Sequence, residues 1–405
     1  GRPEMREEKY FRKGFGLKTQ IQETLRDDYH SSLVDQLRTR ESQLTIRDLT
    51  IRLAEEFGFC YGVDRAVEYA YETRKKFPDR GIFITGEIIH NPHVNNRLRE
   101  MGIRYLEDAP TPEVALAGVQ EEDVVIIPAF GATAEQMSIL KEKGCILVDT
   151  TCGSVLNVWK NVDRYARDGF TSIIHGKHQH EETRATASRA IHLSSGHYLV
   201  VRDLEETELV CSFIRNGRDP DRFRERFEPS ASPGFDPTLH LEKIGLANQT
   251  TMLSSESLTI EAKLKEAFRD RYGEEILAER FRSFDTICSA TQDRQDAVQK
   301  LISEGVDLMI VIGGYNSSNT NHLAEISVDK NPTFHIHDSS CIVDEGQIRH
   351  KPIHQDQEVT TDGWLPSGPV SIGITAGAST PNNKIGEVIE RIIECRGYRV
   401  EESGL

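Results

Sequence analysis

The sequence predicts an α/β protein built from three similar units, each with a parallel sheet. From Leu49 onward, apolar strands alternate with polar loops and helical stripes, a pattern that favours parallel sheets with helices on their faces. Three of the junctions between a strand and a helix carry a cysteine, at Cys60, Cys152 and Cys288. Because the three junctions resemble one another, we interpret the chain as a threefold internal repeat whose cysteines meet at a common axis.

Each of these cysteines stands before a predicted helix. The apolar positions that follow recur at helical spacing, and they are Val63, Ala66, Val67 and Ala70; Val155, Val158, Trp159 and Val162; and Ala290, Ala297, Val298 and Leu301. The positive end of a helix dipole stabilises a thiolate, which is the form that binds metal. Three thiolates are too few to close a structural zinc site, whereas an iron–sulfur cluster held by three keeps one iron open.

Taken singly, each of the three could be an ordinary buried cysteine, and only the repeated context favours a shared metal centre. The other four cysteines lie within apolar or helical patterns. We predict a structural role for Cys145, Cys211, Cys341 and Cys395.

The composition argues against several classes of protein. The 405 residues carry a net charge of −16, whereas a nucleic-acid partner would demand clustered lysine and arginine. No apolar run approaches the ~18–20 residues that span a membrane. Seven cysteines without disulfide-like spacing indicate a reducing compartment. We therefore expect a protein of the bacterial cytoplasm, or of the plastid stroma if the source is a plant or alga, with no nucleic-acid or membrane partner.

We divide the chain into an N-terminal extension and three α/β units. Residues 1–48 are highly charged and are predicted to lie on the surface, and the units are predicted at 49–151, 152–286 and 287–405. Two segments break the alternation of strands and helices. Residues 216–240 are rich in Arg, Phe and Pro, and residues 346–366 are polar and suggest a hairpin. We expect both to be peripheral insertions without a cluster of functional residues.

Two polar loops that follow predicted strands are candidates for an anion site. Residues 313–321 combine two glycines with hydroxyl and amide side chains, which can cradle an anion at a helix N-terminus. A Ser/Asn-rich helix cap is an equally good interpretation of this stretch. Residues 375–380 have the same character and the same ambiguity.

Other strand ends carry titratable groups. His90 and His180 each follow a strand, where an imidazolium can bind phosphate. Glu182 is a candidate general acid if its environment raises its pKa, and a first-turn helix carboxylate otherwise. Thr250 can bond a substrate hydroxyl or cap a helix.

Seven motifs, in order along the chain, resemble those of one enzyme family. They occupy residues 58–66, 88–91, 149–152, 180–183, 248–251, 316–319 and 375–379. The family is that of the 4-hydroxy-3-methylbut-2-enyl diphosphate reductases, which catalyse the last step of the methylerythritol phosphate route to isoprenoids. The long chain, with its extension and insertions, resembles the form found in cyanobacteria and plastids.

This resemblance implies a [4Fe–4S] cluster at the centre of the three α/β units, bound by Cys60, Cys152 and Cys288 with one iron open to the substrate. Two electrons from ferredoxin or flavodoxin would remove the substrate hydroxyl, giving isopentenyl and dimethylallyl diphosphate. Glu182, Thr250 and His180 would be catalytic, with Glu182 supplying the proton for the leaving water. The residues implied to bind the substrate are His90, His180, Thr250, Thr291, Ser317, Ser318, Asn319 and Ser379. A homodimer is compatible with the sequence.

Two positions depart from the family pattern. Phe130 stands where many members have a second diphosphate-binding histidine, although the long form commonly has phenylalanine there. Losing that charge-assisted hydrogen bond forfeits roughly 1.5–3 kcal/mol, so we expect other donors to compensate. Gly153 replaces a proline after the second cluster cysteine, which should loosen the turn without removing a ligand.

Two other functions keep the three-cysteine cluster. In a hydro-lyase the cluster acts as a Lewis acid, and turnover needs no external electrons. A non-enzymatic iron or redox sensor would not bind a diphosphate. The sequence contains no DNA-binding module that could serve as the output of such a sensor.

Overall fold

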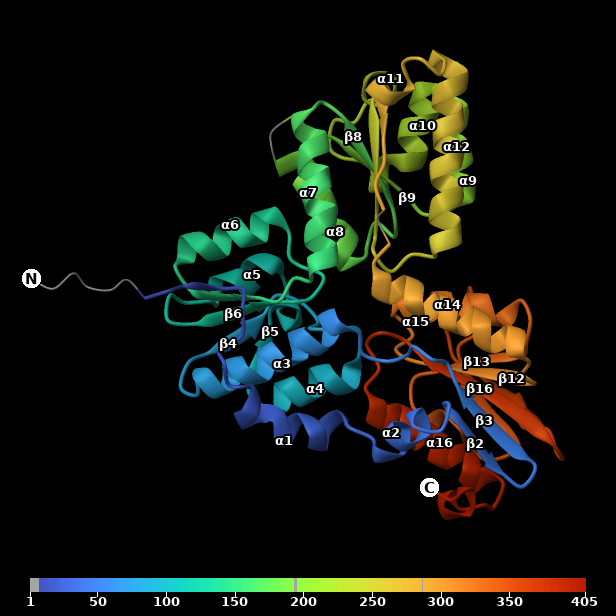
Figure 1. Cartoon of the computed structure of the whole chain (residues 1–405). Helices are drawn as coiled ribbons and strands as arrows, with labels where there is room; N and C mark the ends of the chain where they lie inside the picture. The colour runs from blue at the N-terminus through green and yellow to red at the C-terminus, as the bar shows by residue number, and fades with distance from the viewer. Residues whose placement is uncertain (1–6, 193–194, 286) are drawn as a thin grey trace, which may run out of the picture. The chain divides into compact units, whose positions relative to one another are not determined.

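The computed structural model describes residues 7–192, 195–285 and 287–405, and Figure 1 colours them from blue to red along the chain. The chain divides into two compact units. The first comprises Gly1–Arg12, Arg80–Gly86 and Arg104–Cys288, and the second comprises Lys13–Asp79, Glu87–Ile103 and Ser289–Leu405. Both units are therefore assembled from segments that are far apart in the sequence.

The first unit contains two sheets. One has the strand order β1-β7-β6-β4-β5, formed by β1 (Tyr10–Phe11), β4 (Ile82–Ile84), β5 (Ile103–Tyr105), β6 (Val124–Ile127) and β7 (Ile146–Asp149). The pairs β1–β7, β6–β7 and β4–β6 are parallel. Connecting helices are η1 (Leu106–Asp108), α5 (Pro112–Ala117) and α6 (Ala134–Lys143). Strands β6 and β7 are buried throughout, as expected for short apolar strands of a parallel sheet.

The other sheet of the first unit is fully parallel, with the order β11-β10-β8-β9. Its strands are β8 (Thr171–His175), β9 (Tyr198–Val201), β10 (Ile244–Asn248) and β11 (Phe281–Arg282). Figure 1 shows α7 (Gly153–Arg167) and α8 (Glu181–His192) on one face, and α9 (Leu204–Asn216) and α12 (Ser254–Tyr272) on the other. Separate apolar clusters fill the two faces. The short helix α13 (Leu277–Arg280) leads into β11.

The segment 216–240 is only in part the surface excursion that the sequence suggested, because most of its residues are exposed but its phenylalanines are buried. It forms α10 (Pro220–Phe227), η2 (Glu228–Ser230) and α11 (Pro237–His240). Phe223, Phe227 and Phe235 are buried in the same apolar cluster as Phe213 of α9. Large aromatic side chains gain free energy by leaving water, and here they make the segment part of the core.

The second unit has one main sheet, with the order β13-β12-β16-β3-β2. Its strands are β2 (Gln43–Ile46), β3 (Leu49–Leu53), β12 (Leu308–Ile312), β13 (Thr333–Ile336) and β16 (Val370–Ala376). All pairs are parallel except β2–β3. Helices α14 (Ser289–Glu304) and α15 (Ser318–Val328) pack on one face, and α2 (Ser32–Arg38) and α16 (Asn382–Cys395) on the other.

The remaining elements of the second unit are mostly helical. They are α1 (Lys18–Tyr29), α3 (Tyr61–Lys76), α4 (Pro92–Glu100), η3 (Ser339–Cys341) and η4 (Val400–Ser403). The predicted hairpin within 346–366 is confirmed, because β14 (Gln347–His350) pairs antiparallel with β15 (Val359–Asp362). Ile348 and Trp364 of this insertion are buried in the core of the unit.

Three mostly parallel sheets with helices on their faces confirm the predicted α/β class. The range 49–151, predicted as one unit, contributes strands to two sheets, because β3 pairs with β16 whereas β4 pairs with β6. The threefold relation and the predicted domain boundaries stay predictions. Among the described residues, no helix combines the length and apolar content that a membrane span requires.

The N-terminal extension does not lie wholly on the surface. It supplies β1 to one sheet and β2 to another. Val34, Leu37 and Ile46 are at most 1% exposed, so the prediction of a surface segment is wrong for these residues. Their apolar side chains cover the sheet of the second unit.

Candidate functional site

Cys60 lies in the loop between β3 and α3 of the second unit. It is the N-cap of α3, and its Sγ accepts a hydrogen bond from the N–H of Val63 at 3.5 Å. Gly58, just before it, has a φ of +70°, a conformation that favours glycine. The N–H groups of Gly58 and Cys60 donate to the carbonyls of Ala376 and Ala378. The thiol therefore stands at a helix N-terminus, as the sequence predicts, and against the loop that follows β16.

A buried arginine fixes the backbone before Cys60. Arg294 projects from α14 and is 5% exposed. Its guanidinium donates to the carbonyl of Gly58 at 3.0 and 2.9 Å and to that of Phe59 at 3.2 Å. Sequence reasoning missed this residue. The available signal was a charged residue inside the apolar stripe of a predicted helix, three positions after Thr291, which is also buried.

Cys152 occupies the corresponding position in the first unit, as the N-cap of α7 directly after β7. Its N–H donates to the carbonyl of Ala129 at 2.9 Å. The strand before it ends at Asp149, whose carboxylate accepts a hydrogen bond from the hydroxyl of Tyr10 and pairs with Arg12. The N-terminal extension thus helps to hold the turn that presents Cys152.

Cys288 immediately precedes Ser289, the first residue of α14. The strand predicted to end at Cys288 ends earlier, because β11 covers only Phe281–Arg282. Ser283 and Asp285 are exposed and Phe284 is only partly buried, so the segment lacks the continuous burial of an inner strand. Thr286 of the predicted strand lies outside the described residues. The position of the thiol before a helix is nevertheless as predicted.

The seven cysteines differ in exposure. Cys60, Cys152 and Cys288 are partly exposed, as is Cys395, whereas Cys145, Cys211 and Cys341 are buried. Burial raises the pKa of Cys145, and it raises that of Cys211 to about 11. Buried, protonated thiols are inert, while partly exposed thiols at helix N-termini suit a metal centre. The donor set is thus chemically suited to an iron–sulfur cluster.

Three loops of the second unit lie together at the ends of its elements. Asn91 Nδ2 donates to the carbonyl of Ser379 at 2.9 Å, and Asn319 Oδ1 accepts from the N–H of Ala378 at 2.8 Å. A Cβ on Gly314 would lie 2.8 Å from the carbonyl oxygen of His90, so only glycine allows this approach. The structure therefore gathers five predicted substrate-binding residues, namely His90, Ser317, Ser318, Asn319 and Ser379.

The two interpretations of the 313–321 loop both apply, to different side chains. Ser317 caps α15, since its Oγ accepts from the N–H of Thr320 at 3.3 Å. Ser318 and Asn319 are each 3% exposed, yet Ser318 Oγ and Asn319 Nδ2 have no hydrogen-bond partner among the described residues. Buried donors without partners are costly, and at a helix N-terminus they fit an anionic ligand.

His90 is held by a neighbouring carboxylate. Its Nδ1 lies 2.8 Å from Glu87 Oε2, and its side chain is 16% exposed. A carboxylate on one ring nitrogen fixes the orientation of the imidazole. Glu87, three residues before His90, is a positioning residue to which the sequence analysis gave no role.

In the first unit, Glu182 and Thr250 form a buried pair. The strands β8 and β10, which precede them, are parallel neighbours, so their carboxyl ends share one edge of the sheet. Glu182 is 2% exposed, and the N–H of Thr250 lies 3.0 Å from both of its carboxylate oxygens. The hydroxyl of Thr250 also donates to Glu182 Oε1. The two side chains are therefore in direct contact, and their catalytic roles stay predictions.

A glutamine holds the loop that carries this pair. Gln249 Oε1 accepts from Thr183 Oγ1 at 3.0 Å and from the N–H of Lys177 at 3.1 Å. A Cβ on Gly176 would lie 2.8 Å from Thr183 Oγ1, so the turn after β8 needs a glycine. Gln249 belongs to the motif at 248–251, but its role is visible only in the folded chain.

His180 is oriented by the helix that follows it. The N–H of Glu182 donates to His180 Nδ1 at 3.1 Å, so the neutral ring carries its proton on Nε2. The ring of Phe130 meets that of His180 edge-on, with 6.2 Å between centroids. The phenylalanine that departs from the family pattern therefore packs against one of the predicted diphosphate ligands.

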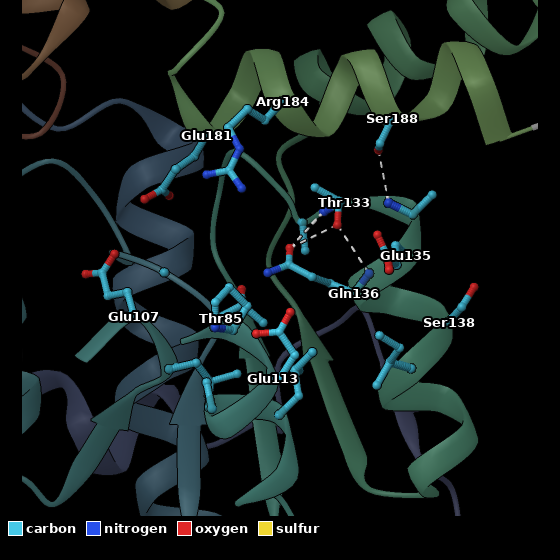
Figure 2. Close-up of a pocket in the computed structure, with 18 of the residues that line it drawn as sticks. Thr85, Glu107, Glu113, Thr133, Glu135, Gln136, Ser138, Glu181, Arg184 and Ser188 are labelled. Atoms are coloured by element: carbon cyan, nitrogen blue, oxygen red, sulfur yellow. Dashed lines mark hydrogen bonds between the residues drawn. The ribbon is translucent and has the colours of Figure 1, made fainter. Parts of the chain in front are cut away.

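A cavity of 890 Å³ in the first unit has a different character (Figure 2). It lies among α5, α6 and α8, and Glu107, Glu113, Glu135 and Glu181 line it together with Arg184. His180, Glu182 and Thr250 are not among the described residues that line it. An excess of carboxylates repels a diphosphate, so this cavity is not the predicted substrate site.

The family model described as LytB protein matches residues 51–393. The chain belongs to the LytB family. A relative from Gloeobacter violaceus is 51% identical over 99% of the chain and 95% of its own length, and one from a Synechococcus strain is 49% identical over 96% of each. Both are named 4-hydroxy-3-methylbut-2-enyl diphosphate reductase. The family and the cyanobacterial long form predicted from the motifs are confirmed.

Solved structures agree with this assignment. One, titled as (E)-4-hydroxy-3-methyl-but-2-enyl diphosphate reductase, the terminal enzyme of the non-mevalonate pathway, is 28% identical and has a TM-score of 0.52. It covers 86% of this chain and 100% of its own. A second solved structure, the reductase from Plasmodium falciparum, is 24% identical and has a TM-score of 0.63. It covers 86% of this chain and 88% of its own. Its likeness supports the fold.

Proposed function

We propose that this protein of the LytB family reduces (E)-4-hydroxy-3-methylbut-2-enyl diphosphate to isopentenyl and dimethylallyl diphosphate. The predicted reaction agrees with the name that the relatives carry. The observation that carries the proposal is the pair of buried, unpartnered donors, Ser318 Oγ and Asn319 Nδ2, at the N-terminus of α15. Such donors suit the diphosphate end of the substrate.

Members of this family are iron–sulfur enzymes, and we propose that Cys60, Cys152 and Cys288 bind a [4Fe–4S] cluster with one open iron. When bound, the cluster supplies single electrons for reductive loss of the substrate hydroxyl. The support for this ligand set is the motif pattern and the shared local context. Each thiol is partly exposed and stands at or directly before a helix N-terminus.

The diphosphate is bound in this proposal by the polar side chains that the motifs indicate. Ser318 and Asn319 donate through the atoms named above, and Ser317 and Ser379 add further hydroxyl groups. His180 donates through Nε2, because its Nδ1 is engaged by the N–H of Glu182. His90 binds through the ring edge that Glu87 leaves open, because the Glu87 carboxylate lies against Nδ1.

Glu182 delivers the proton for the leaving water. Thr250 orients the hydroxyl end of the substrate and holds Glu182 through its N–H and its hydroxyl. Thr291, buried on α14, adds a contact near the substrate. A preorganised acid needs no rearrangement at the moment of proton transfer, which is the advantage of the Glu182–Thr250 pair.

The electron source is ferredoxin or flavodoxin in this proposal. We place the reaction in the bacterial cytoplasm, or in the plastid stroma if the source is a plant or alga, and a homodimer is compatible with it. The hydro-lyase alternative requires no electrons, so omission of the reductant separates the two reactions.

The test is an anaerobic assay of the full chain. The preparation is analysed for iron and sulfide and then given the allylic diphosphate with and without a one-electron reductant. We expect about four irons per chain, reductant-dependent formation of both products, and loss of activity in air. Colourless, iron-free protein would contradict the proposal. Turnover without reductant would support the hydro-lyase. A cluster whose spectrum does not change when the diphosphate is added would support the sensor.

A further inference from the structure

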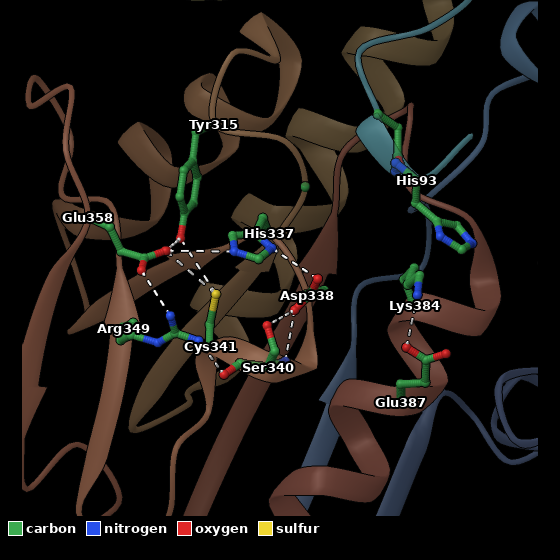
Figure 3. Close-up of polar contacts among 12 residues, drawn as sticks. His93, Tyr315, His337, Asp338, Ser340, Cys341, Arg349, Glu358, Lys384 and Glu387 are labelled. Carbon is green, nitrogen blue, oxygen red and sulfur yellow. Dashed lines mark hydrogen bonds and ion pairs between the residues drawn. The ribbon is translucent and has the colours of Figure 1, made fainter. Parts of the chain in front are cut away.

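A polar cluster in the second unit lies beside the loop that follows β12 but takes no part in the proposed reaction (Figure 3). His337 directly follows β13, Cys341 is the last residue of η3, and Glu358 directly precedes β15 of the hairpin. Tyr315 reaches the cluster from the 313–321 loop. Three segments that are separate in sequence therefore converge on one point, including the hairpin in which the sequence indicated no cluster of functional residues.

The sulfur, nitrogen and oxygen atoms of this cluster face one another. His337 Nε2 lies 3.7 Å from Glu358 Oε2, and Cys341 Sγ lies 3.9 Å from the same oxygen. Ligand atoms of His337, Asp338 and Cys341 all lie within 4.8 Å of one another. Around a tetrahedral zinc ion, bond lengths place N and O about 3.3 Å apart, and S and O about 3.6 Å apart. The observed separations exceed these by a few tenths of an ångström.

Asp338 occupies the supporting position that metal-bound histidines usually have. Its carboxylate lies 3.1 Å from His337 Nδ1, and it also accepts hydrogen bonds from the N–H and hydroxyl of Ser340. A carboxylate on Nδ1 fixes the tautomer and turns Nε2 toward the metal. Nε2 is the nitrogen that faces Glu358 and Cys341 in Figure 3.

The charges of the cluster also fit a cation. Cys341, Asp338 and Glu358 gather around the imidazole of His337, and the hydroxyl of Tyr315 donates to Glu358 Oε2 at 2.6 Å. Arg349 lies 3.5 Å from the other oxygen of Glu358.

A reactive thiol is the main competing explanation for these contacts. A nucleophilic or redox-sensing cysteine must be reached by its substrate or oxidant. Cys341 is 0% exposed, and its thiol faces His337 and Glu358 and not the surface. His337 is 40% exposed, which leaves a path for an ion on the imidazole side. The geometry favours coordination.

We propose that Cys341, His337 and Glu358 form a binding site for a divalent metal ion of the zinc class, with water as the fourth ligand and Asp338 supporting His337. Thiolate, imidazole and carboxylate are the ligands that zinc takes in proteins. The ion ties the β14–β15 hairpin to the end of β13. The site is independent of the proposed reaction and of Cys60, Cys152 and Cys288.

The test measures zinc in the full chain with its cluster in place. Anaerobic protein is incubated with Zn²⁺, desalted, and analysed for zinc, iron and sulfide together, so that the cluster cysteines are known to be occupied. We expect about one zinc per chain in the natural protein, and at least about tenfold weaker binding in Glu358→Gln and His337→Ala. Asp338→Asn should weaken binding by about 10–100-fold.

Two control variants in the same unit should bind zinc as the natural protein does. Glu345→Gln changes an exposed carboxylate just before the hairpin, and Cys395→Ser changes another thiol. Zinc should raise the melting temperature of the natural protein and of both controls, but not that of Glu358→Gln. Because Cys341 is buried and Cys341→Ser could disturb folding, Glu358→Gln and His337→Ala decide the matter. Equal zinc in the natural protein and these two variants, or none in any of them, overturns the proposal.

Discussion

Buried polar groups are in opposite hydrogen-bonding states in the Glu182–Thr250 pair and at the N-terminus of α15. In the first unit, the carboxylate of Glu182 accepts hydrogen bonds from the N–H and hydroxyl of Thr250. In the second unit, Ser318 Oγ and Asn319 Nδ2 are buried without a partner among the described residues. The hydrogen bonds of Glu182 are made within the protein, whereas those of Ser318 Oγ and Asn319 Nδ2 are expected to be made to a ligand.

This contrast separates a group that reacts from groups that bind. A proton donor must be held in one geometry, and the internal hydrogen bonds of Glu182 provide that. Donors for a diphosphate lose affinity if they already have partners, because those bonds must be broken first. The free protein therefore bears the cost of unpaired donors at α15 and recovers it on binding.

The largest effect is expected from Glu182→Gln. The amide keeps the shape of the side chain but cannot deliver a proton, so turnover should fall by about 10²–10⁴-fold while substrate binding and the cluster are retained. Anaerobic steady-state kinetics measure the change. Glu181→Gln, which alters the neighbouring carboxylate at the cavity of Figure 2, is the matched control and should leave the rate near normal. A near-normal rate in Glu182→Gln would remove this residue from its role.

Ser318→Ala tests the buried donors at the N-terminus of α15. Losing a hydrogen bond to a charged ligand costs about 1.5–3 kcal/mol, so diphosphate affinity should fall about 10–100-fold. The free energy of unfolding without ligand should stay the same or rise, because a buried unpaired hydroxyl is removed. Calorimetric binding and denaturant unfolding measure the two quantities. A clear loss of stability with unchanged affinity would reverse our account of α15.

Thr250→Val is the corresponding test of the Glu182–Thr250 pair. It leaves the N–H bond to Glu182 but removes the hydroxyl that donates to the carboxylate, so the free energy of unfolding should fall by about 1–3 kcal/mol even without ligand. Urea unfolding of the free protein checks this. The comparison between the two regions fails if Thr250→Val and Ser318→Ala change stability alike.

Gly153→Pro should have a smaller effect, of opposite sign. Gly153 is the first residue of α7, where proline is favoured, and a Cβ there would meet nothing within 4 Å. Cys152 before it has a φ of −73° and a ψ of 156°, which proline permits in its predecessor. The free energy of unfolding should rise by about 0.4–1 kcal/mol with iron content unchanged. A lower free energy of unfolding or a lower iron content would show that this turn needs the conformational freedom of glycine.

The smallest effect concerns pH and sets the range in which Glu182 variants can be compared. His197 and His240 stack with 3.7 Å between ring centroids. Burial, and for His197 also the charge of His240, lowers the pKa of both. Below about pH 6.5 the unfolded chain then binds more protons than the folded chain, so the free energy of unfolding falls as the pH drops and is fully retained above pH 6.5.

His240→Gln should weaken this pH dependence. Urea unfolding at pH 7.5 and 5.5 gives the difference for each protein, and that difference should be smaller in the variant. The same difference in both proteins would show that other groups cause the loss of stability at low pH.

Local patterns predicted most strands and helices correctly because hydrophobic periodicity is a local property. Val63, Ala66, Val67 and Ala70 are buried on α3 as their spacing indicates. The prediction of a strand ending at Cys288 was wrong, since a short edge strand such as β11 leaves little periodicity to detect. The interpretation of 216–240 was only partly right, because charged residues there mask the phenylalanines that enter the core.

By itself, the sequence determined the family, the helix N-termini that carry Cys60, Cys152 and Cys288, and the loops of the candidate site. Only the tertiary structure decided which distant groups meet. It pairs β3 with β16, brings Arg294 to the carbonyl of Gly58, and sets Glu358 against Cys341. Strand and helix signals reside in neighbouring residues, whereas these contacts join groups whose separation along the chain leaves no local trace.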